Sequence, residues 1–259
     1  MSIATYVFLD LQSNCDPKKS NTKVGITELC MLAIKHEHIV KMKKYQEDPR
    51  VQHKLQMCFN PKSSLNENAS ETGLTEDLLK NEAIFNKEVC ELIKAFIEDL
   101  EDPVCLVAHD GFKFHYPLLK QHLEAFSVKM QKNIVCTDSL YAFLEILESE
   151  KSGTTKYVKV KVGTKPKKNA ISKTKQQYIH IMKGSDNDLI KMRSKINNYT
   201  KLSDVCNKIL TDQEELQSNT AENHCIMLMR MVLTKKDQFL TWLQNNQCLF
   251  SEMPNKVNG

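Results

Sequence analysis

Three stretches of the sequence place metal-binding or proton-transferring side chains beside apolar runs. The first follows the β-branched and aromatic run 5–9, the second follows the apolar run 104–108, and the third opens at 219. The side chains are Asp10 and Gln12 in the first stretch, Asp110 and His115 in the second, and Asn219 and His224 in the third. Carboxylates and imidazoles are the usual general acids, general bases and metal ligands of enzymes. These positions are therefore the first candidates for a functional site.

The periodicity of apolar residues predicts the elements that position these side chains. Strand-like runs occur at 5–12, 24–35, 53–60, 104–108 and 133–137. Helical patterns occur at 75–81, 83–100, 117–126, 139–148, 200–210, 219–233 and 235–245. The early strands follow one another closely, whereas the later ones alternate with helices. This order predicts an α/β fold, a mixed sheet with helices on both faces.

The same three stretches resemble the DEDDh 3′-5′ exonucleases, specifically the three-prime repair exonucleases. That family reads D-x-E, then A-H-N-G-x-x-x-D-x-P-L-L, then H-T-A-E-x-D. This chain reads DLQ, AHDGFKFHYPLL and NTAENH at those places, and four further segments fall in the family order: 26–33, 72–75, 136–140 and 198–202. The resemblance covers nearly the whole chain and implies a ribonuclease-H-like fold. Its exonuclease-like domain would comprise 1–150 and 199–250, with 251–259 as a C-terminal tail.

The resemblance also implies a site in which most catalytic groups are replaced. The family's metal-binding carboxylates would fall at 10, 12, 115 and 224, and its general base at 219. This chain has Asp10, Gln12, His115, His224 and Asn219 there. Imidazole suits softer metals than magnesium, and Asn219 cannot accept a proton. One carboxylate cannot offset two divalent ions about 4 Å apart, so we expect no magnesium site and no cofactor. We expect a protein that binds nucleic acid without cutting it.

Other readings of the same residues remain open. Asp110 could serve as a substitute carboxylate in an active exonuclease that uses Mg²⁺ or Mn²⁺. Alternatively, Asp10, His115 and His224 could hold a transition metal, since one carboxylate and two imidazoles form many zinc, manganese and non-heme iron sites. Glu222 should face away from His224 on their shared helix. In a further class, the cleft is vestigial and the chain is a protein-interaction scaffold.

The resemblance implies a nucleotide-binding turn apart from the metal positions. The turn consists of Thr72, Gly73 and Leu74. In the family it abuts the 3′-terminal nucleotide, and glycine permits the close approach of the backbone. The alternative is an ordinary helix start capped by Thr75. Lys113 stands where the family has a basic residue near the scissile strand.

Positive charge is concentrated in one stretch of the chain. Residues 151–198 contain 13 Lys and Arg against two acids, a net of +11; since the whole chain carries +4, the rest carries −7. Lysines attract phosphate without reading sequence, and Tyr157 and Tyr178 could stack on unpaired bases. We interpret the stretch as a basic, partly flexible insertion that contacts single-stranded DNA or RNA. The alternative is a solvated loop.

The run 53–59 aligns with the dimer-forming edge strand of the family. The resemblance therefore implies a homodimer, and the alternative is a strand paired only within its own sheet. The odd count of nine cysteines, without a C-x-x-C pair, predicts free thiols in a reducing cytoplasmic or nuclear compartment. No apolar run approaches the length of a membrane span, and the family's C-terminal anchor has no counterpart, so we expect no membrane association.

Overall fold

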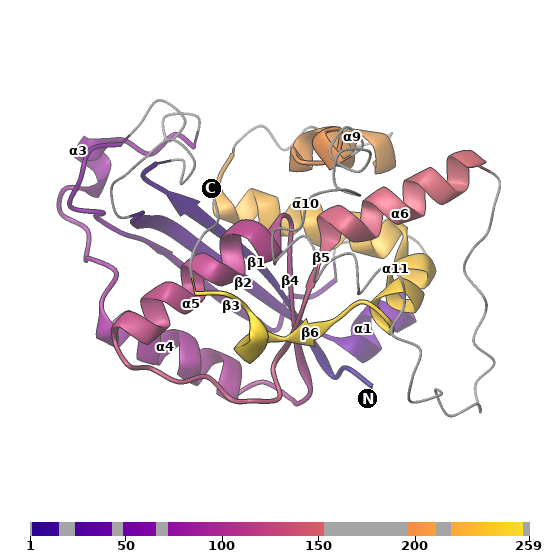
Figure 1. Ribbon diagram of the computed structural model, residues 1–259, viewed down its shortest axis with the longest axis horizontal. Coiled ribbons are helices and arrows are strands. Elements are labelled where there is room, and N and C mark those ends of the chain that lie inside the picture. The colour runs from indigo at the N-terminus through magenta and orange to yellow at the C-terminus, as the bar shows by residue number, and fades with distance from the viewer. Residues whose placement is uncertain are drawn as a thin grey trace.

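The computed structural model describes residues 2–15, 24–42, 49–65, 72–152, 196–210 and 219–255. Its centre is a six-stranded sheet in the order β3-β2-β1-β4-β5-β6, with helices packed around it (Figure 1). The pairs β3–β2, β2–β1 and β5–β6 are antiparallel, whereas β1–β4 and β4–β5 are parallel. The predicted mixed sheet is therefore confirmed.

The strands agree closely with the apolar runs in the sequence. They are β1 (Thr5–Ser13), β2 (Ile26–Lys35), β3 (His53–Cys58), β4 (Val104–Ala108), β5 (Val135–Asp138) and β6 (Cys248–Leu249). Every residue of β4 is buried, as is nearly all of β1 and β2. Side chains of a strand alternate between its two faces, so this burial requires cover on both sides of the sheet. Only β6 was not predicted.

The structure contains the helices that the sequence predicted, together with an unpredicted helix at 36–41 and unpredicted turns at 111–115 and 250–252. They are α1 (His36–Lys41), α3 (Glu76–Leu79), α4 (Lys87–Glu98), the π-helical turn η1 (Gly111–His115), α5 (Tyr116–Ala125), α6 (Ser139–Ser152), α9 (Leu202–Ile209), α10 (Ala221–Thr234), α11 (Lys236–Leu243) and the 3-10 turn η2 (Phe250–Glu252). The helix expected over 83–100 begins only at Lys87. The cause is Asn86, whose side chain accepts the Val89 N–H at 3.0 Å and caps the first turn.

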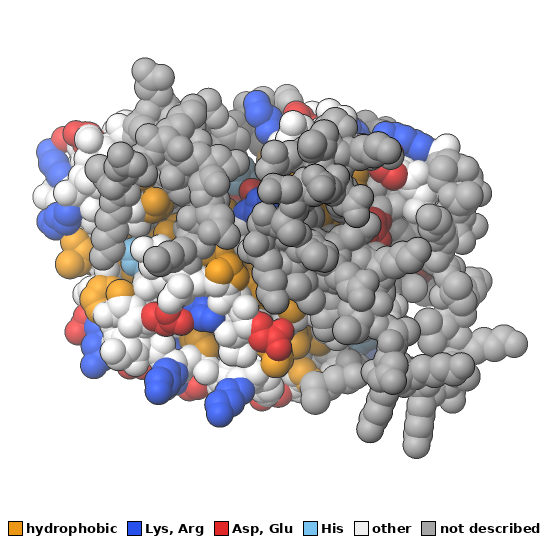
Figure 2. All heavy atoms as spheres, viewed as in Figure 1, with side chains coloured by type: hydrophobic (Ala, Val, Ile, Leu, Met, Phe, Trp, Pro, Cys, Tyr) orange, Lys and Arg blue, Asp and Glu red, His pale blue; other side chains and the backbone are white. Residues whose placement is uncertain are grey.

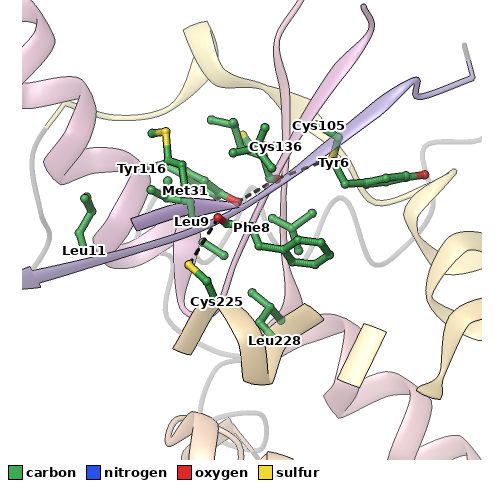
Figure 3. Packing of buried hydrophobic residues seen from close by; sticks show 14 of the residues in the cluster. Tyr6, Phe8, Leu9, Leu11, Met31, Cys105, Tyr116, Cys136, Cys225 and Leu228 are labelled. Carbon is green, nitrogen blue, oxygen red and sulfur yellow. Dashed lines mark hydrogen bonds between the residues drawn. The ribbon is translucent and has the colours of Figure 1, made fainter. Parts of the chain in front are cut away.

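Two internal hydrogen bonds tie the helices to the sheet beside the candidate site. The Cys225 thiol of α10 donates to the Phe8 carbonyl of β1 at 3.4 Å, as drawn in Figure 3. The hydroxyl of Tyr116, at the start of α5, lies 3.0 Å from the Leu106 carbonyl of β4. Both side chains are fully buried. Helix α5, which follows η1, and helix α10, which contains His224, are therefore held against the sheet.

The described residues reach into both ends of the predicted insertion and into the predicted tail. Helix α6 continues through Ser152, and Ile196 is buried in the core, so both ends of the 151–198 stretch belong to the folded domain. Residues 153–195, including Tyr157 and Tyr178, lie outside the described residues. The expected tail begins within η2, and Met253 is buried against the core. The C-terminal segment therefore packs against the domain at least as far as Met253.

Charged side chains of both signs surround the apolar patches on the face shown in Figure 2. All nine cysteines are free thiols. Within the described ranges, no helix is both long enough and apolar enough to cross a membrane.

Candidate functional site

Strand β1 delivers the first two candidate side chains to one face of the sheet. Asp10 and Gln12 are two positions apart, so their side chains point the same way. The Gln12 amide donates to Oδ2 of Asp10 at 2.7 Å. Asp10 is only 6% exposed. A buried carboxylate needs donors, and the first comes from its own strand.

The π-helical turn η1 delivers His115. It starts after Asp110, whose φ of 56° is left-handed, and it passes through Gly111. A Cβ atom on Gly111 would lie 2.5 Å from a ring carbon of Tyr116, so the turn fits only glycine there. Nδ1 of His115 accepts the Leu11 N–H at 3.1 Å. Its Nε2 lies 3.5 Å from Oδ1 of Asp10.

Helix α10 delivers His224 in its first turns. Thr220 caps the helix by accepting the Asn223 N–H at 3.2 Å. Nδ1 of His224 lies 3.3 Å from Oδ2 of Asp10 and 3.2 Å from the Gln12 amide nitrogen. The structure thus brings together four of the five positions implied by the resemblance. Asn219 lies exposed, just before the helix begins.

These contacts form a closed network around a single carboxylate. Oδ1 of Asp10 faces His115, and Oδ2 faces both Gln12 and His224. The magnesium ions implied by the exonuclease family need several anionic oxygens, and the residues present do not fit them. No group of three or more His, Cys, Asp or Glu in the described part of the chain has the geometry to hold a metal ion.

The two histidines are driven toward opposite protonation states. Burial lowers the pKa of His115, against the pull of Asp10. This favours the neutral ring, whose Nδ1 lone pair accepts the Leu11 N–H. Burial also opposes charge on His224, but the charge of Asp10, its hydrogen bond and the charge of Glu28 together raise the pKa of His224. The charged ring donates Nδ1–H to Asp10, and the Gln12 amide donates to Nδ1 only when the ring is neutral.

Glu28 is a second buried carboxylate that the sequence reading did not single out. It lies opposite Gln12 in the β1–β2 register and is 3% exposed. Its Oε2 accepts the Ala221 N–H at 2.9 Å, so it holds the start of α10. Burial raises the pKa of Glu28 and the charge of Asp10 raises it further, although the hydrogen bond from Ala221 opposes them. One sequence signal was available: a lone acid within the apolar run 26–34.

Neither Asp110 nor Glu222 makes a side-chain hydrogen bond or ion pair with Asp10 in the part of the chain that the structure describes. Asp110 forms no hydrogen bond or ion pair with Asp10, His115 or His224 within the described ranges. Its charge, second to burial, helps to raise the pKa of Asp138 to about 7. Glu222 faces the other way, as predicted, and pairs with Lys54 of β3 at 2.7 Å.

The predicted nucleotide-binding turn at 72–74 is held by a left-handed glycine and a hydrogen bond within the turn. Gly73 has a φ of 76°, and the Leu74 N–H donates to the Thr72 hydroxyl at 3.3 Å. Thr75 accepts the Leu78 N–H at 3.2 Å and caps α3, so the helix-start reading is confirmed. Contact of this turn with a nucleotide stays a prediction. Lys113 is partly exposed within η1.

The chain is similar to known three-prime repair exonucleases. It is 32% identical to three prime repair exonuclease 2 of Mus musculus over 157 residues, which cover 58% of this chain and 65% of that protein. It is also 32% identical to the Homo sapiens three-prime repair exonuclease 1 over 160 residues, 57% of this chain and 49% of that protein. The matches thus span between about half and two thirds of the relatives' length. A scan of family models found no match.

Solved structures support the fold. A structure of E. coli Exonuclease I in complex with a dT13 oligonucleotide gives a TM-score of 0.59 at 10% identity, covering 93% of this chain and 43% of that chain. A structure of cell-death related nuclease 4 gives a TM-score of 0.52 at 11% identity, covering 91% of this chain and 64% of that chain. At such low identity these likenesses show the fold alone. The solved structures thus show a ribonuclease-H-like fold, and the curated relatives show that the chain is similar to three-prime repair exonucleases over about half to two thirds of their length.

Proposed function

We propose that this protein is a catalytically degenerate member of its family that binds nucleic acid, with single-stranded ends favoured, and does not cleave it. The observation that supports this is the closed network at Asp10. The only carboxylate retained from the implied ligand set has both oxygens in contact with protein side chains. Metal-assisted cleavage would first require those contacts to break.

The replaced groups weaken each part of the two-metal mechanism. Gln12, His115 and His224 supply no negative charge, so among the implied ligand positions only Asp10 would offer a carboxylate to two divalent ions. Asn219 has no basic atom to activate a water molecule. Among the described residues, Asp110 makes no hydrogen bond or ion pair with Asp10, although its charge acts on His115. The alternative of an active exonuclease with substitute ligands therefore has less support than binding alone.

Binding is supported by the family and by the distribution of charge. Exonuclease I, which shares the fold, has been solved with a bound oligonucleotide. In this chain the positive charge is concentrated in 151–198, and both ends of that stretch are anchored in the domain by α6 and Ile196. Lysine-rich contacts to phosphate weaken steeply as salt is added. We therefore expect salt-sensitive and sequence-independent binding.

Fluorescence anisotropy with end-labelled single-stranded DNA, single-stranded RNA and duplex DNA tests this proposal. Measurements in EDTA and in Mg²⁺ should agree, because no metal is needed. Combined Lys159→Gln and Lys161→Gln substitutions should weaken binding and flatten its salt dependence. The matched control is Lys87→Gln with Lys129→Gln, two exposed lysines outside the insertion. Absence of binding at low salt would favour the scaffold reading instead.

The proposal includes a homodimer through β3 and a cytoplasmic or nuclear location. Strand β3 ends the strand order, so no strand among the described residues pairs with its outer side, where a second copy could add. Light scattering across a concentration series tests the dimer. A monomer at every concentration would remove it from the proposal without affecting nucleic-acid binding.

A further inference from the structure

Two cysteines face each other at the edge of the sheet opposite to β3. Cys136 of β5 is directly paired with Cys248 of β6 in the antiparallel register. Their Sγ atoms lie 3.7 Å apart. Each thiol also lies near the partner's backbone carbonyl, at 3.5 Å for Cys136 and 3.8 Å for Cys248. Both side chains therefore point into the same small space between the two strands.

The backbone spacing of this pair suits a disulfide. Directly opposed residues on antiparallel strands have Cα atoms about 4.5–5.5 Å apart, within the roughly 4.4–6.8 Å that a disulfide spans. Closing the sulfur–sulfur gap to about 2.05 Å requires side-chain rotation more than backbone movement. The strand β6 has only two residues and lies at the sheet edge, so it can adjust.

The two thiols differ in exposure. Cys136, labelled in Figure 3, is fully buried among the core residues of the sheet, and burial raises the pKa of its thiol. Cys248 is partly exposed. A soluble oxidant therefore meets Cys248 first. Cys225 and Cys30 lack such a partly exposed member, because both are fully buried. The Cys225 thiol donates to the carbonyls of Phe8 and Cys30.

We propose that Cys136 and Cys248 form a redox modification site, in which a peroxide oxidises the pair to a disulfide. The Cys248 thiol gives its proton to solvent, and the thiolate attacks one peroxide oxygen; the O–O bond breaks, a sulfenic acid forms, and the released hydroxide takes a proton from solvent and leaves as water. Sγ of Cys136 then attacks Sγ of Cys248. The S–S bond forms as the S–O bond breaks, and the hydroxide takes the Cys136 proton and leaves as water. Two thiols are oxidised by two electrons, and one peroxide is reduced to two waters.

The disulfide would fix the C-terminal segment onto the domain. That segment is already held by the Phe250 N–H, which donates to the Ile134 carbonyl at 2.9 Å, and by Lys120 of α5, whose amine donates to the Ser251 carbonyl at 2.7 Å. The two cysteines are 112 positions apart, and a long closed loop restricts the unfolded chain most. Oxidation should therefore stabilise the fold, and a thiol reductant should reverse the effect.

The test is peptide mapping of the full chain after hydrogen peroxide treatment, under non-reducing conditions. We expect one cross-linked peptide pair, containing Cys136 and Cys248, and a melting temperature raised by roughly 5–10 °C that dithiothreitol restores. Cys248→Ser should abolish both changes, whereas Cys206→Ser, at a partly exposed cysteine outside the pair, should leave them intact.

Because the cross-linked peptides are mapped in the protein without substitutions, the test does not depend on whether the variants fold. A cross-link between other cysteines would overturn the proposal. So would oxidation of Cys248 to sulfinic or sulfonic acid without a cross-link to Cys136. Neither readout uses nucleic acid, so failure here would leave the proposed function unaffected.

Discussion

Nδ1 of His224 lies 3.3 Å from Oδ2 of Asp10, although 214 positions separate the two residues. The resemblance implies a carboxylate at position 224, and two carboxylates in such contact repel unless a cation lies between them. An imidazole attracts Asp10 directly. Oδ2 of Asp10 therefore has a partner within the protein. Oδ1 has one too, because it faces Nε2 of His115.

Restoring the acids should make the fold depend on metal. In the variant with Gln12→Glu, His115→Asp and His224→Asp, four carboxylates would share one buried site. Two unit charges at 4 Å interact by about 4 kcal/mol at an effective dielectric of 20, so this variant should melt below the unmodified protein. Mn²⁺ should raise its melting temperature and leave the unmodified protein unchanged. Asp10→Asn in the same background is the control. An Asp10-dependent shift of the melting temperature by Mn²⁺ in the unmodified protein would show that the present site binds the metal.

The contribution of His224 to stability should depend on pH. Its pKa is raised in the fold, so the folded state holds a proton more tightly than the unfolded chain does. The resulting stabilisation is fully present below the unfolded value of about 6.5 and is lost as the pH rises through the folded pKa. Urea unfolding should therefore show that His224→Gln costs more stability at pH 6 than at pH 9.

An exposed histidine supplies the control for that comparison. His53 lies on the edge strand β3 and is exposed. His53→Gln should cost little at either pH. An equal cost for His224→Gln at both values would mean that the ring acts by packing alone.

The predictable part of this fold is the part that follows from local periodicity. The patterns at 5–12, 24–35 and 219–233 predicted β1, β2 and α10 to within a few residues. The two residues of β6 are too few to show a period. The π-helical turn at η1 depends on Gly111 meeting the ring of Tyr116, a packing relation that no local pattern reports.

The candidate site was predictable only in part, for a similar reason. The motifs indicated that positions 10, 12, 115 and 224 meet, and the structure brings them together. The hydrogen bonds that close the network depend on side-chain rotamers and on burial, neither of which appears in the sequence. The role of Glu28 rests on a contact with Ala221 that lies 193 positions away.

Glu28 should contribute more to the free energy of unfolding than Glu222, which lies in the first turn of α10. Glu28→Ala leaves the buried Ala221 N–H without its acceptor, which typically costs about 1–3 kcal/mol. Glu222→Ala removes a partly exposed ion pair with Lys54, worth at most about 1 kcal/mol. Denaturant unfolding of both variants measures the difference. Equal losses would contradict the anchoring role of Glu28.

His109 should make the fold sensitive to acid. Its ring bridges the Ser139 hydroxyl at 2.9 Å and the Tyr199 carbonyl at 2.8 Å, and burial lowers its pKa to about 4. As the pH falls from about 6.5 to 4, the unfolded histidine gains a proton that the folded one does not, at a cost of about 3 kcal/mol.

The variant His109→Gln keeps a donor for Tyr199 and does not titrate. The stability of the unmodified protein relative to this variant should therefore decline through that acid range and level off below pH 4. Taking the difference in stability between the two proteins cancels the titration of groups that both contain, such as Asp138. A constant difference across the range would contradict this, because it would mean that His109 takes up its proton equally in the folded and unfolded states.

Binding without cleavage is tested by following both in one sample. A 5′-labelled single-stranded oligonucleotide is incubated with the protein in Mg²⁺, Mn²⁺, Zn²⁺ or EDTA, and it is followed by anisotropy and then by a denaturing gel. Asp10→Ala serves as the control. We expect salt-sensitive binding in every condition and an oligonucleotide that keeps its full length. Shortened products that appear with a metal and disappear in Asp10→Ala would contradict this expectation.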